Sequence, residues 1–294
     1  MQLSVNGIDS FVATGGREFD SSQPTVVLLH GAGFDHTTWA LHSRWFAHHG
    51  YGVLAPDLPG HGRSSGAPLP TIADMANWTA ALLDAAGVAT ARLVGHSMGS
   101  LIALETAAQH PAKVSALGLI GTAATMSVGP DLLKAAETND HAAVDMVSIW
   151  GLGYQAELGG SLAPGLWMHS GAQRVLEHGR PGVLFNDLSA CNAYQDALTA
   201  AAKITVPTTL ILGERDMMTP AKSGKALAAA LPNSRTVVLR GAGHMMMVER
   251  PDELLAALQA LTATRFAANR ANTYQAGSTA PLNFARTNSR ISGV

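Results

Sequence analysis

A Gly-x-Ser-x-Gly pattern at residues 95–99 constrains the fold of this chain more than any other feature. Residues 91–94 are typical of the end of a short strand, and the Ala- and Leu-rich residues 101–109 predict a helix. Ser97 is therefore expected at an abrupt turn from strand to helix, where a strained backbone exposes the serine hydroxyl. Because Gly95 and Gly99 lack a Cβ, the strand and the helix can approach closely. The alternative interpretation is an ordinary glycine-rich turn.

Short apolar runs recur along the chain and alternate with helical patterns. Such runs fit strands that are buried on both faces of a mostly parallel sheet. The expected strands are 25–29, 52–57, 91–94, 114–120, 207–213 and 235–239, and a hairpin is expected around Asn6-Gly7. The expected helices are 38–49, 72–86, 101–109, 220–231 and 251–266, with Thr71 and Thr219 as N-caps of the second and fourth. This alternation predicts an α/β fold, with helices on both faces of the sheet.

The strand pattern is interrupted between residues 122 and 202, which look helical and rich in loops. We therefore expect a helical cap, 122–202, inserted between two parts of an α/β core, 1–121 and 203–266. Residues 267–294 are rich in Asn, Thr, Ala and Ser and contain no acidic residue. They predict a mobile C-terminal tail, with a docking arm on the same or a neighbouring subunit as the alternative.

Composition narrows the range of partners. Charged residues make up 14% of the 294 residues and the net charge is −2, which gives no indication of a nucleic-acid partner. The single cysteine, Cys191, excludes an intrachain disulfide. The N-terminal residues do not resemble a signal peptide, and no apolar run is long enough to span a bilayer. We expect a cytoplasmic protein that acts on a small molecule without contacting a membrane, and a homodimer is left open.

A serine hydroxyl needs a base to take its proton, and that base needs an acid to orient it. Catalytic groups of parallel α/β sheets gather beyond the carboxyl ends of the strands. Asp216 follows the strand at 207–213, and His244 follows the strand at 235–239. The histidines lack ligand-like clustering, so no metal or other cofactor is expected.

The chain resembles the α/β-hydrolase superfamily, in particular its small capped Ser-His-Asp members that are esterase-like. The resemblance covers residues 2–266, and its motifs lie at 30–33, 57–64, 95–99, 213–216 and 243–244. It implies the α/β-hydrolase fold, with Ser97 as nucleophile, His244 as base and Asp216 as the acid in the family's chain order. It also implies an oxyanion hole formed by the backbone N–H groups of Ala32 and Met98.

Other residues compete for these roles. Glu214 is the nearest rival of Asp216, and Asp57 also lies at a strand end, although the resemblance gives its loop a structural role. Some family members carry the acid after the strand at 114–120, where this chain has no carboxylate at 121–124. His30 and His61 are interpreted as scaffold. His96 is interpreted as structural, with its side chain on another face.

A serine nucleophile predicts acyl transfer from an ester, thioester or lactone with a small to medium apolar acyl group. The expected substrate-binding residues are Phe34, Trp150, Trp167, Met217 and Met245. Two alternatives remain: hydrolysis of C–C bonds in vinylogous diketone acids, in which a cap arginine (Arg174 or Arg180) would hold the carboxylate, and a ligand-binding receptor on the same fold.

Overall fold

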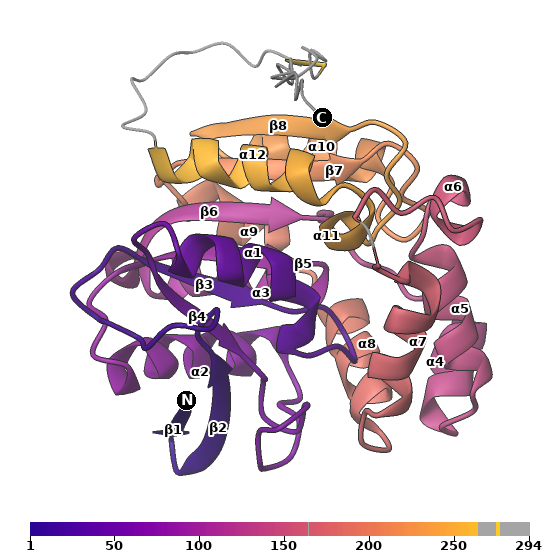
Figure 1. Cartoon of the computed structure of the whole chain (residues 1–294), viewed down its shortest axis with the longest axis horizontal. Helices are drawn as coiled ribbons and strands as arrows, with labels where there is room; N and C mark the ends of the chain where they lie inside the picture. Colours follow the sequence, from indigo (N-terminus) through magenta and orange to yellow (C-terminus); the bar gives the residue numbers. More distant parts are fainter. Residues whose placement is uncertain (164, 264–274, 277–294) are drawn as a thin grey trace, which may run out of the picture.

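The computed structural model of the chain describes residues 1–163, 165–263 and 275–276 (Figure 1). Nine strands form one sheet in the order β1-β2-β4-β3-β5-β6-β7-β8-β9. The first two pair antiparallel, β2 pairs antiparallel with β4, and all other neighbours are parallel. The strands are β1 (Gln2–Val5), β2 (Ile8–Ala13), β3 (Thr25–Leu29), β4 (Gly52–Pro56), β5 (Ala91–His96), β6 (Val114–Ile120), β7 (Thr208–Gly213), β8 (Ser234–Leu239) and β9 (Gln275–Ala276).

The expected mostly parallel α/β sheet is confirmed, and so is the hairpin at Asn6-Gly7. Both turn residues have positive φ, 51° for Asn6 and 78° for Gly7, as a tight two-residue hairpin requires. Of the described residues beyond α12, Gln275 and Ala276 form β9, which pairs with β8. The other residues of the expected tail lie outside the described part of the chain.

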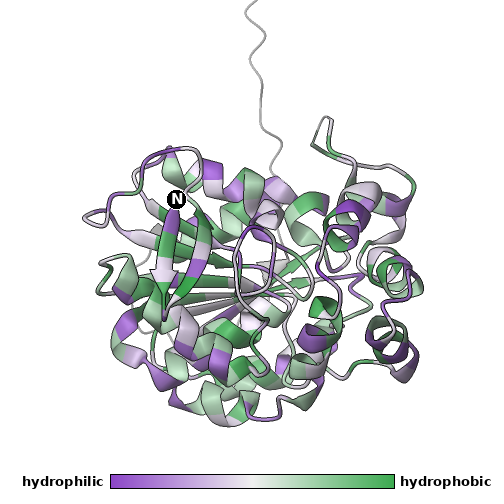
Figure 2. Ribbon diagram, turned by 90° about the horizontal axis from the view of Figure 1, so that it is seen from below, coloured by the Kyte–Doolittle hydropathy of each residue, from purple (hydrophilic) through white to green (hydrophobic). Residues whose placement is uncertain are grey.

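Helices cover both faces of the sheet, and Figure 2 shows the strands lying between two helical layers. One face packs against α2 (Ile72–Ala85), α3 (Met98–Gln109), α9 (Ala197–Lys203) and α10 (Ala221–Ala230). The other packs against α1 (Ala40–Ala47) and α12 (Pro251–Ala263). Alternate residues of β3 serve the two cores: Val27 and Leu29 join the first, Val26 and Leu28 the second. Two apolar cores therefore hold the sheet from both faces.

Five helices between β6 and β7 stand together beyond one end of the sheet, at the right of Figure 1. They are α4 (Pro130–Glu137), α5 (Ala142–Trp150), α6 (Tyr154–Glu157), α7 (Met168–Glu177) and α8 (Val183–Ala193). We call α4 to α8 the cap helices. By contrast, α9 packs against α3 and α10 beside the sheet. The division of the chain into core and cap at residues 121 and 202 stays a prediction.

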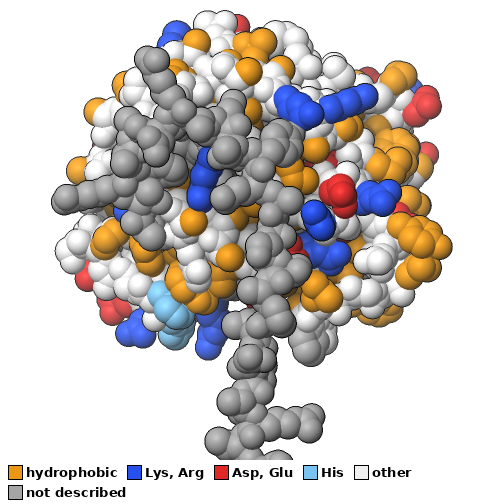
Figure 3. All heavy atoms as spheres, turned by 90° about the horizontal axis from the view of Figure 1, so that it is seen from above, with side chains coloured by type: hydrophobic (Ala, Val, Ile, Leu, Met, Phe, Trp, Pro, Cys, Tyr) orange, Lys and Arg blue, Asp and Glu red, His pale blue; other side chains and the backbone are white. Residues whose placement is uncertain are grey.

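The molecular surface is mixed in character. In the described part of the face turned to the viewer in Figure 3, basic side chains occur in several separate places, with acidic and hydrophobic side chains among them. None of the helices in the described residues has the length and apolar character needed to cross a membrane.

Candidate active site

Ser97 lies at the turn between β5 and α3, with φ 52° and ψ −119°. Such a backbone conformation costs a non-glycine residue about 1–3 kcal/mol, which the surrounding packing must offset. The two glycines of the motif make the turn possible. A Cβ on Gly95 would lie 1.9 Å from the Gly99 carbonyl oxygen, and one on Gly99 would lie 2.3 Å from that of Leu29. Any side chain at either position would push α3 away from the sheet.

Asp216 and His244 come together from the ends of β7 and β8. Nδ1 of His244 donates to Oδ2 of Asp216 at 2.8 Å, and both side chains are almost fully buried. Oδ1 of Asp216 accepts the backbone N–H groups of Met218 at 2.9 Å and Thr219 at 2.7 Å. Burial disfavours the charged carboxylate, but attraction to His244 and these hydrogen bonds outweigh it and lower the pKa of Asp216. The carboxylate therefore stays ionised and orients the imidazole.

Thr219 plays a part that the sequence did not reveal. We expected it to cap the following helix, but α10 begins at Ala221 with Pro220 as N-cap and without a side-chain capping bond. That prediction is wrong because the hydroxyl is used elsewhere: it donates to Oδ2 of Asp216 at 2.8 Å and lies 3.2 Å from Nδ1 of His244. Thr219 thus supports the contact between acid and base.

Ser97 and His244 line the same cavity, whose volume is about 220 Å³. Four of the expected substrate-binding residues, Phe34, Trp150, Met217 and Met245, also line it. Trp167 does not: its side chain lies outside the cavity and is 73% exposed. No Asp, Glu, Lys or Arg occurs among the described residues that line this cavity. Its other lining side chains include Met126, Val128, Leu132, Val147, Leu184, Leu188 and Cys191.

The two expected oxyanion donors, Ala32 and Met98, lie in the loop after β3 and at the start of α3. Ala32 lines the cavity in the loop after β3, and a Cβ on the preceding Gly31 would lie 3.4 Å from Cβ of Ser97. Met98 is fully buried and is the first residue of α3. The first N–H groups of a helix have no acceptor within that helix, and the Met98 N–H is one of them.

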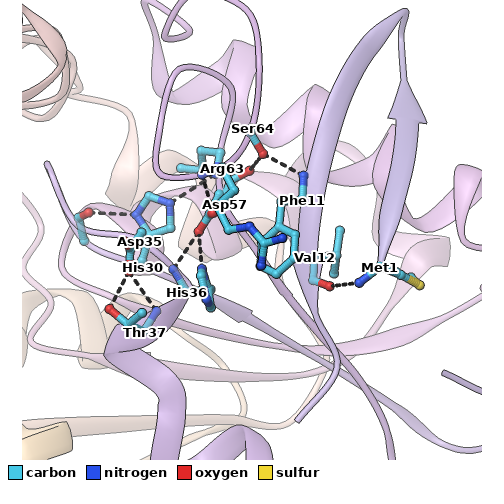
Figure 4. Close-up of polar contacts among 12 residues, drawn as sticks. Met1, Phe11, Val12, His30, Asp35, His36, Thr37, Asp57, Arg63 and Ser64 are labelled. Atoms are coloured by element: carbon cyan, nitrogen blue, oxygen red, sulfur yellow. Dashed lines mark hydrogen bonds and ion pairs between the residues drawn. The ribbon is translucent and has the colours of Figure 1, made fainter. Parts of the chain in front are cut away.

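The loop after β4, residues 57–64, braces the loop that carries Ala32 (Figure 4). Oδ1 of Asp57 accepts from the backbone N–H of His36 at 2.8 Å and from its Nδ1 at 2.7 Å, while Oδ2 accepts the N–H of Arg63 at 2.8 Å. Burial opposes ionisation of Asp57, but these hydrogen bonds outweigh it and lower the pKa of its carboxyl. Asp57 therefore has the structural role that was expected of its loop.

His30 joins the same two loops. Its Nδ1 donates to the Gly31 carbonyl at 2.9 Å, and its Nε2 accepts the N–H of Leu58 at 3.2 Å. This pairing needs a neutral imidazole, and burial lowers the pKa of His30 to about 4. The scaffold role expected for His30 agrees with these contacts.

His96 is buried and donates from Nε2 to the His244 carbonyl at 3.0 Å. Burial lowers the pKa of His96 to about 3, so the ring is neutral. It supports the backbone of the base, as a structural residue would. The expectation that it leaves the strand on another face is wrong, because its ring lies 4.6 Å from that of His244 and lines the cavity.

The nearest rival acid, Glu214, is engaged away from His244. Oε2 of Glu214 accepts the N–H of Gly241 at 2.9 Å in an exposed loop. Gly121 at the end of β6 does touch the base: a Cβ there would lie 2.9 Å from Cε1 of His244. This strand end therefore provides space for the imidazole ring, whereas Asp216 provides the carboxylate.

The two cap arginines stay away from the cavity. Arg174 pairs with Glu177 at 2.7 Å and its side chain is 75% exposed. Arg180 donates to the carbonyl oxygens of Ser64 at 2.6 Å and Gly66 at 3.3 Å. Neither guanidinium is placed to hold a substrate carboxylate beside Ser97.

One cluster of possible metal ligands occurs in the described residues, at Asp35, His36 and Asp57, whose ligand atoms lie within 4.8 Å of one another. Its carboxylate oxygens already accept hydrogen bonds, since Oδ1 of Asp35 takes the N–H of Thr37 at 2.8 Å and both oxygens of Asp57 take N–H groups. The cluster is therefore explained as loop scaffold, and its residues do not line the cavity.

Comparison with known proteins identifies a family and several similar chains. A family model described as "alpha/beta hydrolase fold" matches residues 24–251. A pimeloyl-[acyl-carrier protein] methyl ester esterase of Neisseria meningitidis serogroup B is 32% identical over 236 residues, which cover 74% of this chain and 85% of that protein. A putative carbamate hydrolase, RutD, of Klebsiella pneumoniae is 30% identical over 245 residues, which cover 78% of this chain and 87% of that protein. Among solved structures, the enol-lactonase from Burkholderia xenovorans LB400 superposes with a TM-score of 0.79 at 26% identity, covering 90% of this chain and all of that one.

Proposed function

The chain belongs to the α/β-hydrolase family, and from that premise we propose that it is a serine esterase acting on neutral, apolar acyl groups through an acyl-enzyme. One observation carries the proposal. A serine on a strained turn and a histidine oriented by a buried carboxylate line one cavity that is walled by apolar side chains.

In the first half of the proposed reaction Ser97 Oγ attacks the carbonyl carbon of the ester while Nε2 of His244 takes its proton. The Nδ1–H bond to Asp216 keeps Nε2 free to accept that proton and stabilises the imidazolium that forms. The negative charge moves to the former carbonyl oxygen, which the N–H groups of Ala32 and Met98 stabilise. Each such donor contributes a factor of about 10²–10³ in rate.

The tetrahedral intermediate then collapses: the bond between the carbonyl carbon and the leaving oxygen breaks, and the alcohol departs with the proton from His244. The acyl group remains on Ser97. In the second half water takes the place of the serine: His244 deprotonates it, the hydroxide adds to the acyl carbon, and Ser97 leaves with the proton. The products are a carboxylic acid and an alcohol.

The cavity supports a substrate of limited size without charge. Its volume of about 220 Å³ gives room for a short to medium acyl chain. An unpaired carboxylate is costly to bury among apolar side chains. Because Arg174 and Arg180 are engaged elsewhere, the cavity favours esters, thioesters or lactones over the diketone acids of a C–C hydrolase. The cytoplasmic location and the possible homodimer stay predictions.

The test is a panel of p-nitrophenyl esters of straight-chain acids from two to twelve carbons, together with monoesters of dicarboxylic acids. We expect turnover that peaks at short to medium neutral chains and falls sharply for acids with a free carboxylate. A fluorophosphonate should label Ser97 and no other serine, as located by mass spectrometry, and Ser97→Ala should abolish both turnover and labelling. If the wild-type protein hydrolysed no ester and took no label, the result would favour a ligand-binding receptor on the same fold. A preference for diketone acids would favour the C–C hydrolase.

A further inference from the structure

Asp187 in the cap helix α8 is fully buried and reaches two loops of the core. Its Oδ2 accepts the backbone N–H of Gly33 at 2.9 Å and Nε2 of His61 at 2.7 Å. Its Oδ1 accepts from Nδ2 of Asn186 at 3.2 Å. A carboxylate taken out of water is costly unless it is paired and hydrogen-bonded, so this arrangement has to be maintained by the fold.

Gly33 directly follows Ala32, whose N–H is assigned to the oxyanion hole. We propose that Asp187 is a positioning residue that fixes the Ala32 N–H by clamping the oxyanion loop, residues 31–34, to the cap and to His61. The inference rests on the proposed function, since it assigns Asp187 a role in that reaction. Asp187 does not line the cavity and acts only through the loop.

The packing around Gly33 explains how the hydrogen bond to Asp187 restrains the backbone at Ala32. Gly33 has φ 72°, and a Cβ there would lie 2.9 Å from methyl groups of Leu176 and Leu184, so two cap helices rest directly on this residue. The N–H of Phe34 closes the loop onto the Gly31 carbonyl at 3.2 Å. The N–H that Asp187 holds belongs to the peptide unit immediately after Ala32. Holding that unit therefore restricts the backbone on one flank of the oxyanion donor.

The contacts of His61, the partner of Asp187, favour the protonated imidazole. Nδ1 of His61 lies 3.0 Å from the Pro59 carbonyl and Nε2 lies 2.7 Å from the Asp187 carboxylate. Both of these oxygens are acceptors, so both ring nitrogens must carry hydrogens. Burial opposes the charge, but the attraction of Asp187, the hydrogen bonds to Asp187 and Pro59 and the charge of Asp57 together outweigh it and raise the pKa of His61. The other titratable groups facing the pair are His30, with its ring 4.9 Å from that of His61, Asp57 and Cys191.

The clamp is therefore a buried ion pair that also binds one backbone N–H. When the pH rises through the raised pKa of His61 and the ring loses its proton, the charge attraction that holds Asp187 against both loops disappears. Acyl transfer should then fall on the alkaline side before the protein unfolds.

Asp187→Asn tests the clamp because it keeps the shape and removes the charge. We expect kcat for the preferred aryl ester to fall about tenfold, a part of the loss for a whole oxyanion donor, with KM changed by less than about threefold. The alkaline limb of the kcat profile should move to lower pH, because His61 loses its counter-ion. Asp187→Glu should not restore kcat, since the longer side chain cannot occupy the same buried site, whereas His61→Gln should reproduce the loss of kcat.

Arg180→Ala is the matched control. Arg180 also ties the cap to the loop after β4, through the Ser64 and Gly66 carbonyls, but it does not touch the oxyanion loop. It should lower the melting temperature without lowering kcat. Equal losses of kcat in Arg180→Ala and Asp187→Asn would overturn the inference, because docking of the cap would then explain both.

A measurement without substrate separates this inference from the proposed function. In ¹⁵N-labelled protein the Gly33 amide should shift and exchange faster with solvent in Asp187→Asn, and the wild-type amide should do so on raising the pH. An unchanged Gly33 amide overturns the inference, whichever esters the protein hydrolyses. Wild-type protein that hydrolyses no ester but loses Gly33 protection in the variant overturns the proposed function and leaves the clamp supported.

Discussion

The hydroxyl of Thr219 donates a 2.8 Å hydrogen bond to Oδ2 of Asp216, the same oxygen that accepts from Nδ1 of His244. Together with the N–H groups of Met218 and Thr219 on Oδ1, this bond holds the carboxylate plane in place. The loop after β7 thus forms a small cage in which the acid can rotate only by breaking several hydrogen bonds.

Thr219→Val should weaken catalysis by removing this donor without changing the size of the side chain. A hydrogen bond to a charged group is worth about 1.5–3 kcal/mol, so we expect kcat to fall by about tenfold or more. Thr219→Ser keeps the hydroxyl and should retain most of the activity. Steady-state kinetics on an aryl ester would check both variants, and equal activity of Val and Ser would argue against the cage.

Asp216→Asn should lower kcat by about 10⁴, the scale of this change in a serine protease, because the amide favours the wrong imidazole tautomer. The double variant with Ser97→Ala should be hardly worse than Ser97→Ala alone, since the residues act as a unit. Glu214→Gln is the control and should do little, because Glu214 contacts the Gly241 N–H and not the base. If Glu214→Gln lost most of its kcat while Asp216→Asn lost little, Glu214 and not Asp216 would be the acid.

Gly121→Ala should damage the site by crowding the base. The added Cβ would lie 2.9 Å from Cε1 and 3.0 Å from Nδ1 of His244, and the φ of 55° disfavours any side chain. We expect a large fall in kcat and a lower melting temperature. Gly171→Ala in α7, where a Cβ would meet nothing within 4 Å, should leave kcat unchanged and keep or raise stability. A Gly121→Ala variant with wild-type kcat would contradict the observed contact.

Trp150 and Trp167 of the cap allow a comparison between a side chain that lines the cavity and one that is exposed on the surface. Trp150 lines the cavity, so Trp150→Ala should enlarge it and shift the preference of kcat/KM towards longer acyl chains. Trp167→Ala removes a side chain of the same type that is 73% exposed and outside the cavity, and should leave the chain-length profile unchanged. The profile measured over the ester panel decides. If Trp167→Ala alone shifted the chain-length profile, Trp167 would have to be counted among the substrate-binding residues.

Stability should depend on pH through His61, whose pKa is raised in the folded protein. Its contribution is complete below the unfolded pKa of about 6.5 and is lost as pH rises through the higher folded pKa. Wild-type protein should therefore exceed His61→Gln in free energy of unfolding most at pH 6, and the difference should shrink at alkaline pH. Urea denaturation from pH 6 to 9 measures it. A difference that grows with pH would mean that His61 is neutral when buried.

Local signals in the sequence accounted for much of the fold. The apolar runs predicted the parallel strands β3 to β8, and the Asn6-Gly7 pair predicted the hairpin that the structure contains. The positions of Asp216 and His244 followed from the rule that catalytic groups gather beyond strand ends. The sequence did not reveal the role of Thr219, because a threonine just before a helix also fits the pattern of an N-cap. Only the folded structure brings its hydroxyl to the carboxylate of Asp216.

The sequence by itself determined the order of strands β3 to β8 and of the core helices α1, α2, α3, α10 and α12, and the sharp turn at Ser97. It could do so because propensity, glycine spacing and apolar period are local properties of the chain. Tertiary structure alone decided that Trp150 lines the cavity while Trp167 faces solvent, and that Asp187 meets Gly33 and His61. The physical reason is that these choices depend on how the cap helices dock on the core. Docking balances burial and charge between residues separated by as many as 154 positions, a balance that no local pattern encodes.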